Sequence, residues 1–278
     1  MKGEPAATHV LITGASAGLG LELARLFAAD GSALVLVARN ESKLAALAGI
    51  LRKDFEVDVR IIPADLTRPN AVPDLLNALN EAGIGIRVLV NNAGFGAYGP
   101  VLDRHWDVYR RMIDLNITAL TGLTRGLLPG MVACAENGGR PGIMNVASTA
   151  AFQPGPLMAV YFATKSYVLS FSEALHEEVK SSGVSVSAFC PGPTRTEFFR
   201  QDDMIPTDRI TEEELAEYHR RDARRMDAET AATVGYQGFL KGDAIVIPGF
   251  RNRFLAQAGR FLPRVVIRRL AFRMLKKD

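Results

Sequence analysis

A tyrosine and a lysine four residues apart, Tyr161 and Lys165, have the types and spacing that most clearly indicate chemistry. On a helix, residues with this spacing lie one above the other on the same face. A free phenol has a pKa of about 10, and a nearby positive charge favours the phenolate. We therefore expect Lys165 to lower the pKa of Tyr161, so that its phenol can give a proton to a carbonyl oxygen. Ser148 lies thirteen residues upstream, at the end of an apolar run.

A carbonyl reduction also needs a hydride source, and a glycine-rich turn near the N-terminus predicts where one would bind. An apolar run over 9–13 is broken by the turn over 14–20, after which apolar residues recur at helical spacing until Gly31. Glycines let the backbone approach a pyrophosphate closely, and the start of a helix presents free N–H groups and a positive dipole end. The alternative is a tight strand-to-helix turn that binds nothing.

The next apolar run predicts which dinucleotide is bound. Residues 33–38 are typical of a buried parallel strand, and they end at Arg39. In dinucleotide-binding folds an acidic residue at this place binds the ribose 2′-hydroxyl of NAD. A guanidinium instead matches the 2′-phosphate of NADP in charge and geometry, so Arg39 favours NADP(H). The alternative is an arginine that is simply solvated.

The alternation of strands and helices continues along the chain and predicts an α/β fold. We expect helices near 41–53 and 70–82, and strands over 57–62 and 87–90 that lead into Asp65 and into residues 91–94. Repeated strand-helix units form a parallel sheet covered on both faces, with ligands at the carboxyl ends of the strands. The prediction is a doubly wound parallel sheet of the Rossmann type, forming a single domain over residues 1–250.

The second half of the domain follows the same pattern. A long helix is expected over 103–130 and carries Asn116, whose amide lies among apolar neighbours and must find partners, so a structural hydrogen bond in the core is one interpretation. We then expect a strand ending at Ser148, a helix from about 161 to 182, a strand over 184–189, a helix capped by Asp227 and running to about 240, and a last strand over 243–249.

Composition excludes several other classes of protein. The chain has 278 residues and two cysteines without a CxxC pair, which argues against a disulfide framework or a thiolate metal site, and we expect no metal. The N-terminus lacks an export signal, and no run of about 20 uninterrupted apolar residues follows. The expectation is therefore a cytoplasmic protein.

Together these motifs resemble those of the short-chain dehydrogenase/reductase family, which they follow in order over roughly residues 8–250. The resemblance implies that Tyr161 is the general acid in reduction and the base in oxidation, that Ser148 hydrogen-bonds the substrate oxygen, that Lys165 holds the nicotinamide ribose, and that Asn116 anchors a water in the proton relay. It implies a cofactor site made, besides Tyr161 and Lys165, of Gly14, Ser16, Gly18, Leu19, Gly20, Arg39, Asp65, Leu66, Asn92, Ala93, Gly94, Pro191, Gly192 and Thr194.

Two further regions bear on the substrate and on partners. A segment over about 193–226 corresponds to the family's substrate lid, and its Phe198 and Phe199 indicate an apolar substrate, with Phe152 and Met158 as further walls; core packing is the rival interpretation for each. Residues 251–278 carry nine Lys/Arg and one Asp, a charge of +8 that leaves 3 − 8 = −5 for the rest of the chain. This basic amphipathic tail could lie on an anionic membrane, or pack on its own domain or a second subunit. Nothing besides charge favours nucleic acid.

The sequence thus predicts an NADPH-dependent carbonyl reductase or alcohol dehydrogenase that acts on a small-molecule ketone, aldehyde or secondary alcohol of apolar character. By the resemblance it would be a homodimer or homotetramer. The alternative is a catalytically silent dinucleotide-sensing or scaffold protein of the same fold.

Overall fold

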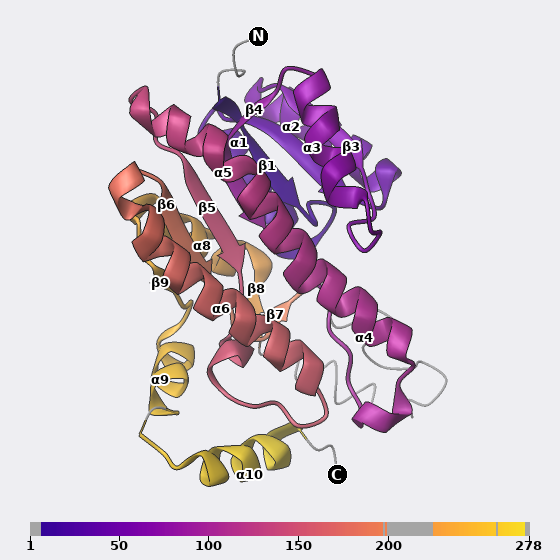
Figure 1. The fold of residues 1–278 in the computed structure, drawn as a ribbon, viewed down its shortest axis with the longest axis vertical. Helices are drawn as coiled ribbons and strands as arrows, with labels where there is room; N and C mark the ends of the chain where they lie inside the picture. Colours follow the sequence, from indigo (N-terminus) through magenta and orange to yellow (C-terminus); the bar gives the residue numbers. More distant parts are fainter. Residues whose placement is uncertain (1–6, 197, 199–224, 260, 276–278) are drawn as a thin grey trace.

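A seven-stranded parallel sheet forms the centre of the molecule in the computed structural model, which describes residues 7–196, 198, 225–259 and 261–275 (Figure 1). The strands stand in the order β3-β2-β1-β4-β5-β6-β9, so the chain winds outward from β1 first in one direction and then in the other. This confirms the predicted doubly wound sheet. The strands are β1 (Ala7–Thr13), β2 (Ala33–Ala38), β3 (Val59–Pro63), β4 (Gly85–Asn91), β5 (Gly142–Val146), β6 (Ser185–Phe189) and β9 (Ile245–Val246).

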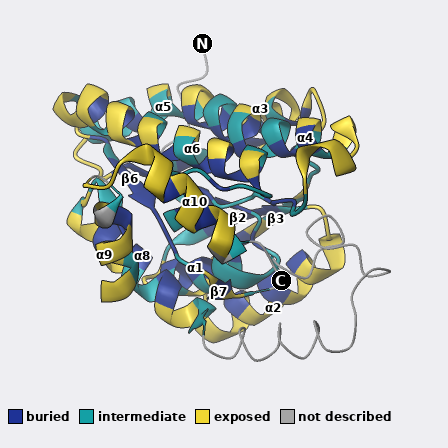
Figure 2. Ribbon diagram, turned by 90° about the horizontal axis from the view of Figure 1, so that it is seen from below, coloured by how far each residue is buried: buried dark blue, intermediate teal, exposed yellow. Residues whose placement is uncertain are grey.

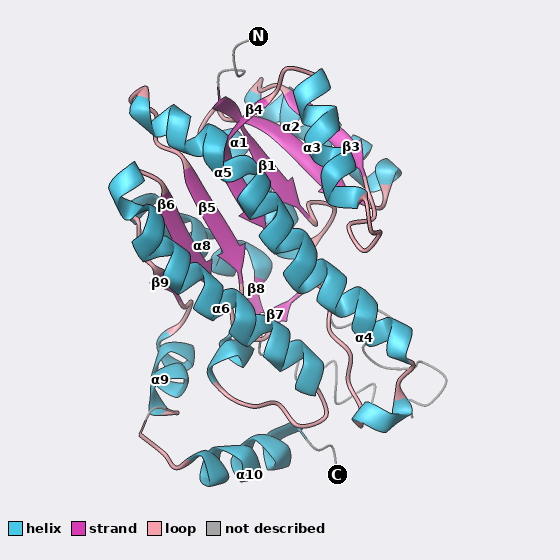
Figure 3. Ribbon diagram, in the orientation of Figure 1, coloured by secondary structure: helices cyan, strands magenta, loops and turns pink. Residues whose placement is uncertain are grey.

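Helices cover both faces of the sheet, which explains why its strands are nearly continuous apolar runs (Figure 3). In β1, the side chains of Val10 and Ile12 belong to one core cluster and Leu11 to the other, as alternation along a strand requires. The first cluster is completed by α1 (Gly18–Ala29), α2 (Glu41–Phe55) and α8 (Ala228–Lys241). The second is completed by α3 (Ala71–Glu81), α5 (Leu120–Glu136) and α6 (Ala159–Val179).

The long helix expected over 103–130 is present and extends further, from Trp106 to Glu136. It consists of α4 (Trp106–Ile113), a π-helical stretch over Asp114–Ala119, and α5. By length and composition alone this stretch could also cross a bilayer. In the structure its Leu123 and Met131 are buried in the core cluster that α5 shares with the sheet.

Of three segments near the C-terminus, one matches the sequence prediction and two differ from it in detail. Asp227 caps α8 as expected, since its carboxylate accepts a hydrogen bond from the Thr230 N–H at 2.7 Å. The last strand is shorter than 243–249, because only Ile245 and Val246 pair with β6. The tail forms two helices, α9 (Phe250–Ala258) and α10 (Arg264–Leu275), and Pro263, which cannot donate a backbone hydrogen bond, precedes the second.

The ends of the predicted lid are joined by a small second sheet. The strand β7 (Thr194–Arg195) pairs in parallel with β8 (Met226–Asp227). Residues 194–195 and 226–227, at the two ends of the predicted lid, therefore lie side by side on the domain. Most of the lid predicted over 193–226, including Phe199, lies outside the described residues.

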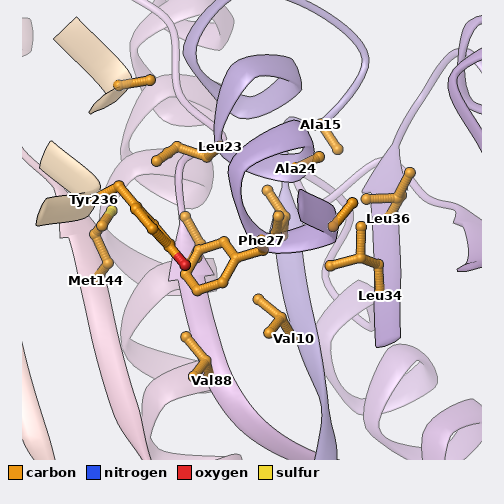
Figure 4. Packing of buried hydrophobic residues seen from close by; sticks show 14 of the residues in the cluster. Val10, Ala15, Leu23, Ala24, Phe27, Leu34, Leu36, Val88, Met144 and Tyr236 are labelled. Atoms are coloured by element: carbon orange, nitrogen blue, oxygen red, sulfur yellow. The ribbon is translucent and has the colours of Figure 1, made fainter. Parts of the chain in front are cut away.

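Phe27 of α1 provides a test of the core on the α1 and α8 side (Figure 4). Its ring is 2% exposed and makes edge-to-face contacts with Tyr236, at a centroid distance of 4.8 Å, and with Phe239. Replacement of a buried phenylalanine by alanine removes its apolar contacts and leaves a cavity, at a cost of about 3–5 kcal/mol. We expect Phe27→Ala to lower the free energy of unfolding by this amount in urea titrations. The matched control is Phe55→Ala at the exposed end of α2; equal urea midpoints for the two variants would contradict the described packing.

Candidate active site

Tyr161, Lys165 and Ser148 lie together at the carboxyl end of β5, as the sequence predicts. Tyr161 and Lys165 are one turn apart on α6 and both are buried. Ser148 follows β5 directly, and its hydroxyl contacts the Tyr161 phenol closely enough to influence its pKa. The Ser148 hydroxyl also accepts a hydrogen bond from the Ala150 N–H at 3.1 Å and so caps the short 3-10 helix over Thr149–Phe152. The serine is both a cap and a neighbour of the phenol.

The Lys165 ammonium is held between the ends of two strands. It donates a hydrogen bond to the Val146 carbonyl of β5 at 2.8 Å and lies 5.9 Å from the centroid of the Tyr161 ring. On its other side, a side chain added at Gly94 would place its Cβ 3.4 Å from the Lys165 nitrogen and 3.0 Å from Oδ1 of Asn116. Glycine at position 94 therefore keeps room for the ammonium.

The expected lowering of the Tyr161 pKa by Lys165 is wrong for this structure. Burial raises the pKa of Tyr161 to about 12, and contact with the Ser148 hydroxyl opposes only part of this rise. Burial also lowers the pKa of Lys165 to about 8. Both groups lose hydration of their charged forms on burial, and this loss sets the direction of both pKa shifts. Tyr161 consequently keeps its proton at neutral pH, which is the form that a general acid needs.

Asn116 lies in the π-helical stretch between α4 and α5, fully inside the protein. Its side chain donates hydrogen bonds to the Phe95 carbonyl and to Oγ1 of Thr164, both at 3.0 Å, and accepts one from the Phe95 N–H. Thr164 in turn donates to the Tyr161 carbonyl at 2.7 Å. Asn116 thus connects the loop after β4 to the helix that carries Tyr161 and Lys165. These contacts agree with the structural interpretation of its amide, and the water-anchoring role stays a prediction.

The glycine turn after β1 is clamped to the loop after β4. The Asn92 side chain donates to the carbonyls of Thr13 and Gly14, at 2.9 and 3.1 Å. The Thr13 hydroxyl accepts from the N–H groups of Asn92 and Ala93, both at 3.0 Å. The Asn92 amide therefore fixes the turn, and its place in the cofactor site stays a prediction. The sequence analysis did not predict that the Thr13 side chain would hold the two loops together. The available signal was a hydroxyl at the last position of β1.

The turn itself has the features that a dinucleotide phosphate requires. Gly14 and Gly18 have φ values of +65° and +56°, which favour glycine, and a Cβ at Gly20 would lie 2.3 Å from the Gly14 carbonyl oxygen. The helix α1 begins at Gly18, and its cap residue Ala17 offers no side-chain acceptor. Its first N–H groups therefore have no capping side chain, and they favour an anion. Ser16 and Leu19 lie in the same turn, both partly exposed.

Arg39 is exposed at the carboxyl end of β2, across from Asp65 after β3. Burial alone would raise the pKa of Asp65, but hydrogen bonds from Thr67 and the positive charges of Arg39 and Arg68 outweigh it and lower the pKa. Two cations and one carboxylate therefore share this corner of the sheet edge. Leu66 is buried in the core beside them, so it can contribute apolar contact and its backbone.

The loop after β6 brings Pro191, Gly192 and Thr194 to the same edge. The Pro191 carbonyl accepts a hydrogen bond from the Thr149 N–H at 2.9 Å, which joins this loop to the residue after Ser148. The Thr194 hydroxyl donates to the Gly192 carbonyl at 2.9 Å. A Cβ at Gly192 would lie 2.4 Å from Nδ2 of Asn252, so glycine here permits the close approach of α9. Asn252, in the tail, was not predicted.

An apolar cluster surrounds the Tyr161 ring. The Phe198 ring lies 5.7 Å from the Tyr161 ring, and Met158 is buried in the same cluster, so two of the four residues expected to line a substrate site are placed there. Phe152 packs in a different cluster with Ala256 of α9. Leu275, at the end of α10, packs against the Tyr161 cluster, and its carbonyl accepts a hydrogen bond from the Tyr98 hydroxyl at 2.7 Å.

Among the residues that the structure describes, no group of three His, Cys, Asp or Glu side chains is arranged to hold a metal ion. The polar atoms of the site are instead hydroxyls, amides, backbone groups and one ammonium. This donor set suits a hydrogen-bonded organic cofactor.

Comparison with known proteins agrees with the geometry. The chain is 33% identical to the human very-long-chain 3-oxoacyl-CoA reductase. The matched segment covers 65% of this chain and 57% of the length of that relative. The chain resembles the structure of a short-chain dehydrogenase from Sphingobium yanoikuyae in complex with NADPH, with 35% identity, coverage of 91% and 93% of the two chains and a TM-score of 0.75. It also resembles the structure of a bulky-bulky ketone specific alcohol dehydrogenase from Comamonas testosteroni, with 31% identity, coverage of 92% and 93% of the two chains and a TM-score of 0.71.

The family model for short chain dehydrogenases matches residues 8–204, which is most of the chain. This range includes all of the residues described above at the carboxyl edge of the sheet, up to the start of the predicted lid. The site, the fold and this match lead to one conclusion: the chain belongs to the short-chain dehydrogenase/reductase family of oxidoreductases.

Proposed function

We propose that this protein is an NADPH-dependent carbonyl reductase, reversible as an alcohol dehydrogenase, whose substrate is an apolar ketone, aldehyde or secondary alcohol. The observation that carries the proposal is the burial of a protonated Tyr161 against the Ser148 hydroxyl, one helical turn from the Lys165 ammonium. A catalytically silent protein of the same fold would have no need to keep these three groups together.

The three side chains can act in sequence on a carbonyl group. The Ser148 hydroxyl can donate a hydrogen bond to the substrate oxygen and stabilise negative charge as it develops there. The Tyr161 hydroxyl gives its proton to the same oxygen, and in the reverse direction the phenolate takes it back. A bound nicotinamide would supply the hydride to the carbonyl carbon. Lys165 provides a positive charge beside the phenol, which stabilises the phenolate that proton transfer leaves behind.

The cofactor preference is inferred from the corner formed by Arg39 and Arg68. A 2′-phosphate there would meet two cations, whereas the 2′-hydroxyl of NAD would gain nothing from them and would depend on Asp65. The NADPH bound to the Sphingobium yanoikuyae relative supports the same preference.

The apolar nature of the substrate is inferred from what surrounds Tyr161. Phe95, Met158 and Phe198 are all members of the Tyr161 cluster or pack against it, so a carbonyl next to the phenol would have apolar neighbours. The bulky-bulky ketone named for the Comamonas testosteroni relative is of this chemical kind.

Removal of the Tyr161 hydroxyl tests the mechanism. We expect Tyr161→Phe to lower kcat for NADPH-dependent ketone reduction by a factor of about 10² to 10⁴, because the proton donor is lost. Its affinity for NADPH, measured from the fluorescence of the bound cofactor, should change only a few-fold. The control is Tyr167→Phe on the same helix, whose hydroxyl bonds Thr121 at 2.9 Å. Equal kcat values for the two variants would rule out Tyr161 as the acid.

Charge reversal at Arg39 tests the cofactor. We expect Arg39→Asp to raise the KM for NADPH by a factor of about 10 to 100, because a charge-assisted hydrogen bond to the phosphate is lost. The KM for NADH should stay within a few-fold of the wild-type value. The control is Arg60→Asp in β3, an exposed arginine that pairs opposite Val35 and lies away from the carboxyl end of the strand. An equal rise for both cofactors in Arg39→Asp would refute the phosphate assignment.

The pKa of Lys165 predicts how NADPH binding depends on pH. Below about 8 the ammonium is charged and attracts the anionic cofactor; above it the proton is lost, because burial lowers the pKa from its ordinary value of 10.5. Tyr161 does not titrate in this range. We expect the affinity for NADPH to be constant from pH of about 6.5 to 7.5 and to fall by up to about 10- to 100-fold above 8.

Fluorescence titrations with NADPH at a series of pH values measure this dependence. Lys165→Arg is the control, because a guanidinium stays charged throughout the range and should abolish the fall. A wild-type affinity that is unchanged up to pH of about 9.5 would show that Lys165 is not the group that titrates.

A further inference from the structure

Large apolar side chains are exposed in one region of the molecule above all others. Of the sixteen large hydrophobic residues that are exposed within the described part of the chain, nine lie between residues 250 and 272. Phe250 and Phe261 are each 85% exposed. The other seven are Phe254, Leu255, Leu262, Val265, Val266, Leu270 and Phe272. We call these nine residues and the exposed arginines between them the tail surface. A concentration of this kind marks a binding face rather than ordinary surface.

Packing of the tail on its own domain accounts for a different set of residues. Ala256 of α9 is buried against the cluster that contains Phe152, and Ile267 and Ala271 of α10 are buried as well. Asn252 contacts Gly192, and the Leu275 carbonyl accepts the hydrogen bond from Tyr98. The tail therefore docks through a few residues, Ala256, Ile267, Ala271, Leu275 and Asn252, while the nine large apolar residues of the tail surface are presented to the outside. Figure 2, which views this end of the molecule, shows the exposed sides of α9 and α10.

The exposed apolar residues alternate with cations that have no carboxylate partner. Arg251, Arg253, Arg264, Arg268, Arg269 and Arg273 are all exposed, and within the described residues none of them forms an ion pair. The sequence has no Asp or Glu between residues 250 and 277. Elsewhere on the molecule, by contrast, arginines such as Arg25, Arg60 and Arg110 pair with carboxylates.

Charge decides between the two occupants that would cover an apolar face. A second copy of the chain meeting this face by two-fold symmetry would bring two tails of charge +8 against each other, and like charges oppose that contact. The surface of a bilayer that contains acidic lipids offers hydrocarbon for the apolar residues and, in the layer directly above it, negative headgroups for the arginines. We propose that the tail surface binds peripherally to an anionic lipid bilayer.

The bound orientation would turn the substrate side of the enzyme toward the lipid. Leu275 packs against the cluster that contains Tyr161, and Tyr98, which bonds the Leu275 carbonyl, accepts on its own carbonyl a hydrogen bond from Arg104 at 3.1 Å. Two more exposed apolar residues flank this arginine, Leu102 at 96% and Trp106 at 67%. Figure 1 shows α4, which Trp106 begins, and α10 at the same end of the molecule. An apolar carbonyl compound dissolved in the bilayer would then reach Tyr161 from the membrane. This delivery of substrate rests on the proposed function, whereas the docking of the tail surface on the bilayer does not rest on it.

Co-sedimentation of the full-length protein with vesicles tests the docking without any measurement of activity. We expect binding to vesicles of phosphatidylcholine mixed with phosphatidylserine, and little binding to phosphatidylcholine alone. The double variant Arg264→Gln/Arg269→Gln should bind the mixed vesicles about 30-fold more weakly, at about fivefold for each arginine near the surface. Phe250→Ser/Phe261→Ser should weaken binding by at least about tenfold, because both rings are exposed and would lose burial in the interface.

The matched control is Lys53→Gln/Leu240→Ser, which removes one exposed cation and one exposed apolar residue outside the tail and should bind like the wild type. Sedimentation velocity without lipid, on the wild type and the two tail variants, separates the bilayer from a second copy. A change in oligomeric state in the tail variants would make this face a subunit contact and overturn the proposal, as would equal binding to both kinds of vesicle or to neither.

Trp106 reports the orientation, because it is the one tryptophan of the sequence. With vesicles that contain brominated phosphatidylcholine and phosphatidylserine, we expect its fluorescence to be quenched on binding. Binding without quenching would refute the orientation that faces the site to the membrane, while the co-sedimentation result would still decide the docking itself. Turnover of a water-soluble ketone in the absence of lipid tests the proposed function separately.

Discussion

The structure of the site depends on the burial of one ammonium group. Lys165 can be buried because the last carbonyl of β5 accepts its hydrogen bond, and because Gly94 leaves space beside it. Both conditions fix where α6 crosses the sheet, and the position of α6 in turn places the Tyr161 phenol against Ser148. A buried charge without such contacts would cost several kcal/mol, so the helix has little freedom to shift. The position of the Tyr161 phenol beside Ser148 is thus a consequence of how one lysine is accommodated.

The arrangement of the sheet and its catalytic end could be predicted from the sequence, because both follow from patterns of short range. Apolar runs such as 33–38 are typical of strands buried on both faces, and the parallel arrangement brings their last residues to one edge. The placement of Tyr161 and Lys165 on one face of a helix could be predicted from their four-residue spacing alone. The parallel direction of the strands, which this pattern predicts, is also why Arg39, Asp65 and the glycine turn were placed correctly at the same edge.

What the sequence could not provide were hydrogen bonds between residues that are far apart in the chain. The amide of Asn91 donates to Oδ1 of Asn145 at 2.9 Å, and Asn145 donates to Ser172 on α6 at 2.9 Å, but each of these residues alone looks like an ordinary polar residue in an apolar run. The clamp between Asn92 and the Gly14 turn spans seventy-eight residues. The pKa of Tyr161 was predicted in the wrong direction for a related reason: the distance to Lys165 was readable from the spacing, whereas the burial of both groups was not.

The small sheet of β7 and β8 has a consequence for how this enzyme family member can vary. Because the two strands pair with each other, the segment between residues 195 and 226 is a closed loop whose ends are fixed at one place on the domain. The entropy of closing such a loop grows only with the logarithm of its length, by about 0.6 kcal/mol for each doubling. Insertions, deletions or whole replacements within it therefore cost the fold little. This segment can therefore change in length or sequence at little cost to the sheet and to the positions of Ser148, Tyr161 and Lys165.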